Sequence, residues 1–312
     1  MQEKGRVEAK EGVLILGVPR SGTTLLRRLI HAHPSFACPP ETNVFTACGR
    51  FLRSETLADG TRIGVLEGLR YAGIDDGKVT QRLRELAFDL HREYAARQGK
   101  RRWAAKTAFD VFYLREIEQL VGDQVAFVCI HRHGLDVASS LQELCDKNGV
   151  YLRELHDYIV RYPARLPAFA HAWRDLTNAL VDFAERRKGD VYCLKYEDLV
   201  EDPNRSMQDL MCFLGEGWDP SYSERALQDR TSVGLGDWKT FRLTEITSSS
   251  RGRWRHLPPH TVRCLAEICN STLERCGYPP VRIETNTSSE DPTRRYQLGL
   301  LLQRLKPSNS GQ

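Results

Sequence analysis

The sequence predicts an α/β fold in which a central, mainly parallel sheet lies between layers of helices. Short apolar runs of strand length alternate with segments whose apolar residues recur every three or four positions, an alternation typical of βαβ units. A glycine-containing turn joins the first such run to the first helical segment. With 312 residues and 41% hydrophobic content, the chain can bury the core of one large domain.

The expected elements follow in order along the chain. Apolar runs predict strands at 13–16, 102–106, 124–130 and 191–195. Helical spacing predicts helices at 25–30, 111–120, 204–214 and 259–276. The sequence is also largely helical up to about Arg97, with a break at 75–77, and again up to Arg187, with breaks at Pro163 and Pro167. The stretch 229–257 has no clear period and predicts a long loop.

Composition excludes several classes of protein. A net charge of +4 is too small in a chain of this size to indicate nucleic-acid binding. The N-terminus is charged and the first apolar run has only strand length, so we expect no signal peptide or membrane anchor and a cytoplasmic protein. Nine scattered cysteines without C-x-x-C pairs favour a reduced compartment over a disulfide framework or a zinc site.

The turn at Gly17–Thr24 has the G-x-x-x-x-G frame of a phosphate-binding loop, but Thr23 stands where a nucleotide kinase has lysine. Free amides at the start of the following helix and close-approaching glycines make such a junction an anion site. Arg20 adds a cation inside the loop. The missing lysine argues against triphosphate chemistry but leaves phosphate binding intact. The bare frame also fits a strand-to-helix turn without a ligand.

The string from Gly17 to Leu26 resembles the phosphosulfate-binding loop of sulfotransferases that use 3′-phosphoadenosine 5′-phosphosulfate (PAPS). The longer stretch up to Glu41 is especially similar to the tyrosylprotein sulfotransferase branch. The resemblance implies a P-loop-type three-layer domain, PAPS as the donor and no required metal. It assigns the donor's 5′ side to the loop residues Arg20, Ser21, Gly22, Thr23 and Thr24.

Three later segments also resemble this family. Arg132, at a strand end, and Ser140, in the next helix, match the residues that bind the 3′-phosphate. Arginine presents planar paired donors to a phosphate, which suits this role. The segment 248–255 resembles the loop that closes over the same phosphate, with Arg251, Gly252 and Arg253 as its candidate contacts.

Two further nucleotide contacts follow from the resemblance. Tyr196, in a Y-E-D-L string, is a candidate for contact with the adenine, because an aromatic ring offers stacking area. Ser232 or Lys239, near the G-D-W-K string, is a candidate for a contact elsewhere on the nucleotide.

Sulfuryl transfer needs a proton acceptor and positive charge near the departing phosphate. Lys106, in a K-T-x context, matches the lysine that the family places near the sulfuryl group, and Arg20 adds a second cation. Many cytosolic sulfotransferases have a basic histidine two residues later, but Ala108 stands there. The tyrosylprotein branch uses a glutamate after the loop helix, which makes Glu41 the candidate general base. His131 and His133 are rival bases by residue type.

The resemblance implies one sulfotransferase domain at 1–280 and a polar C-terminal tail at 281–312. Helical insertions at about 44–101 and 142–188 are expected to form the acceptor site. The acceptor is expected to be a small-molecule or peptidyl hydroxyl, and a homodimer is expected as an assembly. Protein tyrosine is not assumed, because Pro40 replaces an acidic residue of the tyrosylprotein branch. A P-loop nucleotide kinase and a non-catalytic nucleotide-binding protein are the alternatives.

Overall fold

The computed structural model describes residues 10–228 and 245–282. Its main sheet has five parallel strands in the order β2-β5-β1-β6-β7. Their bounds are β1 Gly12–Leu16, β2 Phe36–Ala37, β5 Arg102–Lys106, β6 Val125–His131 and β7 Val191–Lys195. The predicted α/β class with a central, mainly parallel sheet is therefore confirmed.

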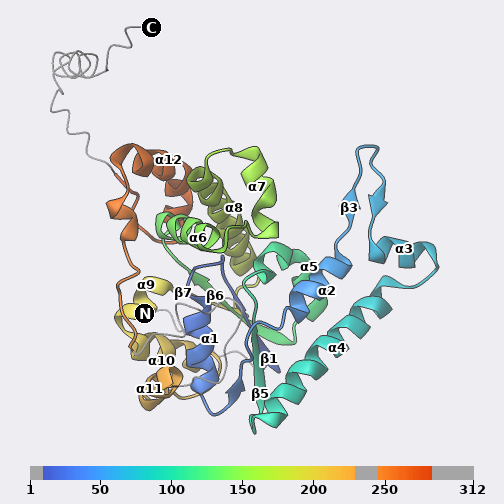
Figure 1. Cartoon of the computed structure of the whole chain (residues 1–312). Coiled ribbons are helices and arrows are strands. Elements are labelled where there is room, and N and C mark those ends of the chain that lie inside the picture. The colour runs from blue at the N-terminus through green and yellow to red at the C-terminus, as the bar shows by residue number, and fades with distance from the viewer. Residues whose placement is uncertain (1–9, 229–244, 283–312) are drawn as a thin grey trace, which may run out of the picture. The chain divides into compact units, whose positions relative to one another are not determined.

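Helices cover both faces of the sheet (Figure 1). On one face, Ile15 belongs to a buried cluster that includes side chains from α1 (Thr23–Ala32) and α10 (Pro203–Phe213). On the other, Phe127 packs edge-on against Phe183 of α8 (Arg165–Arg186), with ring centroids 4.9 Å apart. The helices α6 (Gly134–Asn148) and α12 (Pro259–Arg275) pack against α8. Two faces buried in this way explain the continuous apolar character of the strands.

The segment between β2 and β5 is a mainly helical insertion that packs against β5, and its two short strands form a separate sheet. It contains α2 (Val44–Leu52), the hairpin β3 (Glu55–Thr56) and β4 (Arg62–Ile63), α3 (Val65–Tyr71) and α4 (Asp76–Arg97). Trp103 of β5 anchors it, because this ring lies 5.8 Å from Phe45 of α2 and 5.1 Å from Phe88 of α4. The segment is thus attached to the strand that carries Lys106.

The remaining described helices are short, between three and eight residues each. They are the 3₁₀ helix η1 (Asp110–Tyr113), α5 (Leu114–Val121), η2 (Arg153–Leu155), α7 (His156–Arg161), α9 (Tyr196–Glu201), α11 (Ser221–Gln228) and η4 (Arg253–His256). The chain divides into a compact unit, Met1–Pro280, and a second segment, Val281–Gln312, of which only the first two residues are described.

Two expectations about the helices are wrong. Pro167 does not interrupt a helix but lies in the first turn of α8, where backbone amides have no helical acceptor and proline costs little. The segment 53–64 is not helical: it forms the β3–β4 hairpin, whose turn contains Asp59 and Gly60. Gly60 has a φ of 85°, and an Asp-Gly pair is a hairpin signal that the helical interpretation overlooked.

Candidate functional site

The phosphate-binding loop joins β1 to α1 as predicted. The amide of Ser21 donates to the carbonyl of Val18 at 3.0 Å, and both Arg20 (φ 76°) and Gly22 (φ 93°) adopt left-handed backbone conformations. For an arginine this conformation is costly and is typical of functional loops. At Gly22 a side chain has no room, because an added Cβ would lie 2.3 Å from a ring carbon of Tyr196.

Gly22→Ala is therefore expected to destabilise the protein by about 2–4 kcal/mol, since backbone strain and overpacking act together. Gly60→Ala is the matched control, because Gly60 also has a positive φ but faces open space. That control is expected to cost only about 1 kcal/mol from the backbone conformation. Urea unfolding of both variants measures the difference, and equal losses would show that the Tyr196 contact is unimportant.

Lys106 connects the loop to the candidate base. It ends β5, beside β1, and its Nζ donates to Thr24 Oγ1 at 3.0 Å and forms an ion pair with Glu41 Oε1. The Lys106 side chain is 2% exposed and that of Glu41 is 12% exposed. The lysine absent from position 23 is thus supplied by a neighbouring strand.

Two hydrogen bonds hold the start of the segment that carries Glu41. Cys38 accepts a hydrogen bond on its carbonyl from Arg27 at 3.2 Å, and its amide donates to His31 Nδ1 at 3.0 Å. Asn43 ends the segment with a φ of 56°, a left-handed conformation that asparagine tolerates. These contacts hold Glu41 beside Lys106.

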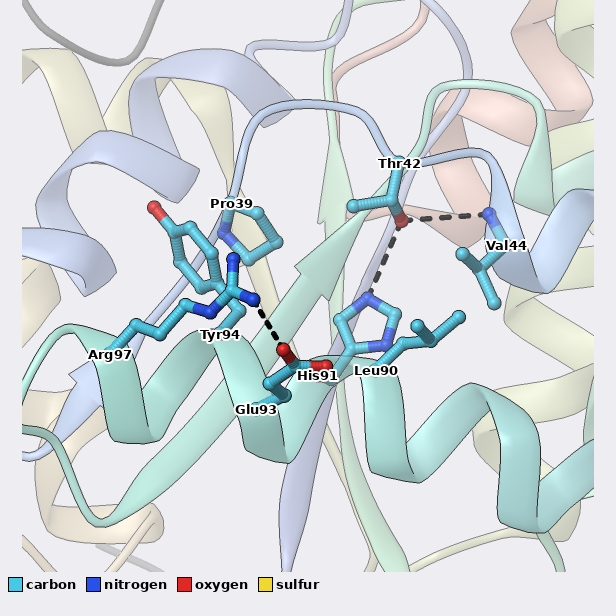
Figure 2. A pocket seen from close by; sticks show the side chains of 8 residues that line it. All are labelled: Pro39, Thr42, Val44, Leu90, His91, Glu93, Tyr94 and Arg97. Atoms are coloured by element: carbon cyan, nitrogen blue, oxygen red, sulfur yellow. Dashed lines mark hydrogen bonds and ion pairs between the residues drawn. The ribbon is translucent and has the colours of Figure 1, made fainter.

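A cavity of about 420 Å³ lies between this segment and α4 (Figure 2). His91 Nδ1 lies 2.7 Å from the carbonyl of Ala87 and must donate there, so Nε2 faces Thr42 Oγ1 at 3.4 Å as an acceptor. Burial lowers the pKa of His91, which favours this neutral form. Glu41 itself does not line the cavity, whose walls are Pro39, Thr42, Val44, Leu90, His91, Glu93, Tyr94 and Arg97.

Arg132 and Ser140, the residues predicted for the 3′-phosphate, converge on Arg20. Arg132 donates to the carbonyl of Arg20 at 2.9 Å and to the carbonyl of Ser250, and Arg20 Nε donates to Ser140 Oγ at 3.2 Å. Among the described atoms, the buried Ser21 Oγ and Arg132 Nε have no hydrogen-bond partner. Buried donors without a partner beside a phosphate-binding loop are suited to bind an anionic ligand.

Tyr196 lies next to the same loop. Its ring packs against Gly22, and the Arg132 guanidinium lies 4.6 Å from the ring centroid. Tyr196 is 8% exposed, so little of its surface is open to a ligand. Its contact with adenine stays a prediction, and its observed role is to shape the loop.

The closing segment is attached through its backbone. Asp136 of α6 accepts hydrogen bonds from the amides of Gly252 at 2.7 Å and Trp254 at 3.1 Å. The side chains of Arg251 and Arg253 are about half exposed, and they pair with Glu201 and Glu143, respectively. Their contact with a phosphate stays a prediction.

The sequence did not predict this contact of Asp136, because its partners are more than a hundred residues away along the chain. The candidates Ser232 and Lys239 lie outside the described residues, as do 229–244 of the predicted long loop and 283–312 of the predicted tail.

Asp136→Ala is expected to weaken binding of adenosine 3′,5′-bisphosphate about tenfold, because it removes two charge-assisted hydrogen bonds that hold the closing segment. Hydrogen exchange at 245–256 is expected to accelerate in parallel. Glu201→Ala, which breaks only the exposed pair with Arg251, is the control and should change affinity less than twofold. Unchanged exchange in Asp136→Ala would contradict the attachment.

The two rival histidines are unsuited to act as bases. His131 is 8% exposed and lies inside the sheet, at the end of β6. His133 stacks on Trp254 with ring planes 9° apart, and burial lowers the pKa of His133 to about 4. Neither faces Lys106 or Glu41 in any described contact.

Among the described residues, no cluster of three or more His, Cys, Asp or Glu side chains is arranged to hold a metal ion. The nine cysteines are free thiols. Within the same residues, no helix combines the length and the apolar character that crossing a bilayer demands.

The family model described as "Sulfotransferase family" matches residues 12–220. Nodulation protein NoeE of Sinorhizobium fredii is 27% identical over 257 residues, which cover 77% of this chain but only 59% of NoeE. Protein-tyrosine sulfotransferase 2 of Gallus gallus is 24% identical over 290 residues, which cover 90% of this chain and 72% of that protein.

Two solved structures share the fold. The sulfotransferase domain of the curacin biosynthetic pathway has a TM-score of 0.59 at 18% identity and covers 89% of this chain and 100% of that domain. The sulfotransferase domain of the Synechococcus PCC 7002 olefin synthase has a TM-score of 0.53 at 21% identity, with coverage of 86% and 98%. These two likenesses concern the fold, which both domains share over most of this chain.

Proposed function

The chain belongs to the sulfotransferase family, and we propose that it transfers a sulfuryl group from PAPS to a hydroxyl group of an acceptor. The observation that carries this proposal is Lys106, which contacts Thr24 of the phosphate-binding loop and Glu41 at the same time. A cation near the phosphosulfate and a carboxylate near the incoming hydroxyl are the two groups that the reaction needs.

In the proposed reaction, Glu41 accepts the proton of the acceptor hydroxyl as its oxygen attacks sulfur. Lys106 and Arg20 stabilise the negative charge that develops on the departing phosphate, with the help of the hydroxyl groups of Thr23 and Thr24. The bond from the acceptor oxygen to sulfur forms as the bond from sulfur to the phosphate oxygen breaks, and adenosine 3′,5′-bisphosphate leaves. The spare donors of Ser21 and Arg132 support binding of its phosphates.

We propose a phenol or an alcohol as the acceptor, presented by a small molecule or a tyrosyl peptide. The curated relatives include protein-tyrosine sulfotransferases, which supports a phenolic hydroxyl. The largely apolar cavity between the Glu41 segment and α4 supports a contribution of the insertion 44–101 to acceptor binding. The corresponding role of 142–188, the homodimer and the cytoplasmic location stay predictions.

Incubation of the protein with radiolabelled PAPS and a panel of phenols, alcohols, sugars and tyrosine peptides tests the proposal. The expected result is label on at least one class of hydroxyl acceptor and release of adenosine 3′,5′-bisphosphate. Tight binding of the bisphosphate without any transfer would instead indicate a non-catalytic nucleotide-binding protein. Preferential, magnesium-dependent binding of ATP would indicate a kinase.

A further inference from the structure

A second buried carboxyl group, that of Asp110, follows Lys106 by four residues and is close enough to Glu41 and Lys106 to feel their charges. Asp110 begins η1, directly after the turn that follows Lys106, and is 1% exposed. Its amide donates to the carbonyl of Thr107 at 3.2 Å, and its Oδ1 accepts from Thr46 Oγ1 of α2 at 2.6 Å. Asp110 thus joins the Lys106 end of β5 to the insertion 44–101.

The other carboxyl oxygen of Asp110 is unused. Oδ2 is buried and accepts no hydrogen bond from any described residue. A buried polar atom in this state is costly and calls for an explanation other than packing. A purely structural role would need only Oδ1, which already accepts the hydrogen bond from Thr46.

The charged groups that act on Asp110 are Glu41 and Lys106, the two groups of the proposed catalytic pair. The pKa of Asp110 is raised to about 7, chiefly by burial and to a lesser extent by the negative charge of Glu41, against the lowering effects of the Thr46 and Thr107 hydrogen bonds and of Lys106. From α2, the neighbouring titratable group is the Cys48 thiol, which stays neutral because burial raises its pKa to about 11. Asp110 therefore changes its charge near neutral pH, while its interacting neighbours Glu41 and Lys106 are the two groups of the proposed catalytic pair.

We propose that Asp110 is a positioning residue for sulfuryl transfer, which holds the Lys106 end of β5 and, when ionised, adds a second negative charge near Glu41. This inference rests on the proposed function. Ionised Asp110 places a second negative charge near the point at which the acceptor hydroxyl gives up its proton, which favours this proton transfer electrostatically. Protonated Asp110 keeps its structural contacts but lacks this effect.

The pH profile of kcat tests the proposal, because a merely structural role would not change its shape. In the wild-type protein, kcat is expected to rise roughly three- to tenfold as the pH increases through about 7. Asp110→Asn retains an oxygen for Thr46 but cannot ionise, so this rise should disappear while the KM for PAPS changes less than about twofold. Asp59→Asn, in the exposed β3–β4 turn, is the control and should keep the wild-type profile.

A second variant and a second measurement keep the test independent of how well Asp110→Asn folds. Thr46→Val removes the hydrogen bond that favours ionised Asp110, so the rise in kcat should move to higher pH. In the folded wild-type protein, Asp110 binds its proton more tightly than it does in the unfolded chain, because its pKa is raised from the ordinary 3.8 to about 7. Stability is therefore expected to fall as the pH rises from about 4 to about 7, and this fall should be smaller in Asp110→Asn.

The outcomes separate the two proposals. A wild-type protein that binds adenosine 3′,5′-bisphosphate but transfers sulfate to no acceptor contradicts the proposed function, and the role of Asp110 falls with it. A wild-type protein that transfers sulfate, with a pH profile shared by Asp110→Asn and unmoved in Thr46→Val, contradicts only the role of Asp110.

Discussion

Replacement of Glu41 by glutamine is expected to lower kcat by about 10²- to 10⁴-fold, the usual contribution of a general base. The amide oxygen of glutamine can still accept a hydrogen bond from Lys106, so the loop should keep its shape. Affinity for adenosine 3′,5′-bisphosphate is therefore expected to change less than about twofold, because the substitution removes only one negative charge near the phosphates. Steady-state transfer assays and calorimetric titration with the bisphosphate measure the two effects.

The control for this variant is Glu85→Gln, which makes the same chemical change on the exposed side of α4. It should leave both kcat and nucleotide affinity unchanged. A Glu41→Gln protein that retains more than about a third of wild-type activity would exclude Glu41 as the base. The search would then turn to a proton acceptor supplied by the acceptor molecule or by solvent.

Arg132→Ala is expected to weaken binding of adenosine 3′,5′-bisphosphate by about 10²-fold, since hydrogen bonds from a guanidinium to a phosphate contribute about 1.5–3 kcal/mol each. Adenosine 5′-phosphosulfate, which lacks the 3′-phosphate, should lose much less affinity. Calorimetric titration of both ligands measures the difference. Arg132→Lys should be intermediate, because lysine keeps the charge but not the paired donors.

The choice of ligand distinguishes two roles of Arg132. Arg132 also donates to the carbonyl of Arg20 and so supports the strained part of the phosphate-binding loop. If both ligands lose affinity equally, this support is its main role and the assignment to the 3′-phosphate is wrong. Arg165→Ala, which breaks an exposed pair with Asp146, is the control and should affect neither ligand.

Local sequence patterns predicted most of the sheet. The strands at 102–106 and 191–195 agree with the structure at both ends, because apolar runs of this length bounded by polar residues have few alternatives inside an α/β core. The β3–β4 hairpin was harder to predict. Its strands have two residues each and both are exposed, so they carry no apolar alternation and only the Asp59–Gly60 turn marks them.

Resemblance to a family identified the candidate site residues, but it did not identify their supports. Lys106, Glu41 and Arg132 occupy motif positions and were named from the sequence. The supporting contacts of Asp136 and Asp110 were not predicted, because they depend on burial and on residues far along the chain. A buried carboxylate cannot be told from a surface one by residue type alone.

The sequence by itself determined the phosphate-binding loop, because all of its parts lie between Gly17 and Thr24 and its turn depends on local backbone preferences. The absent lysine at position 23 was equally visible. Only the tertiary structure decided what replaces it. Since β5 pairs with β1 in parallel, the carboxyl ends of both strands meet at one edge of the sheet, and this places Lys106 between Thr24 and Glu41.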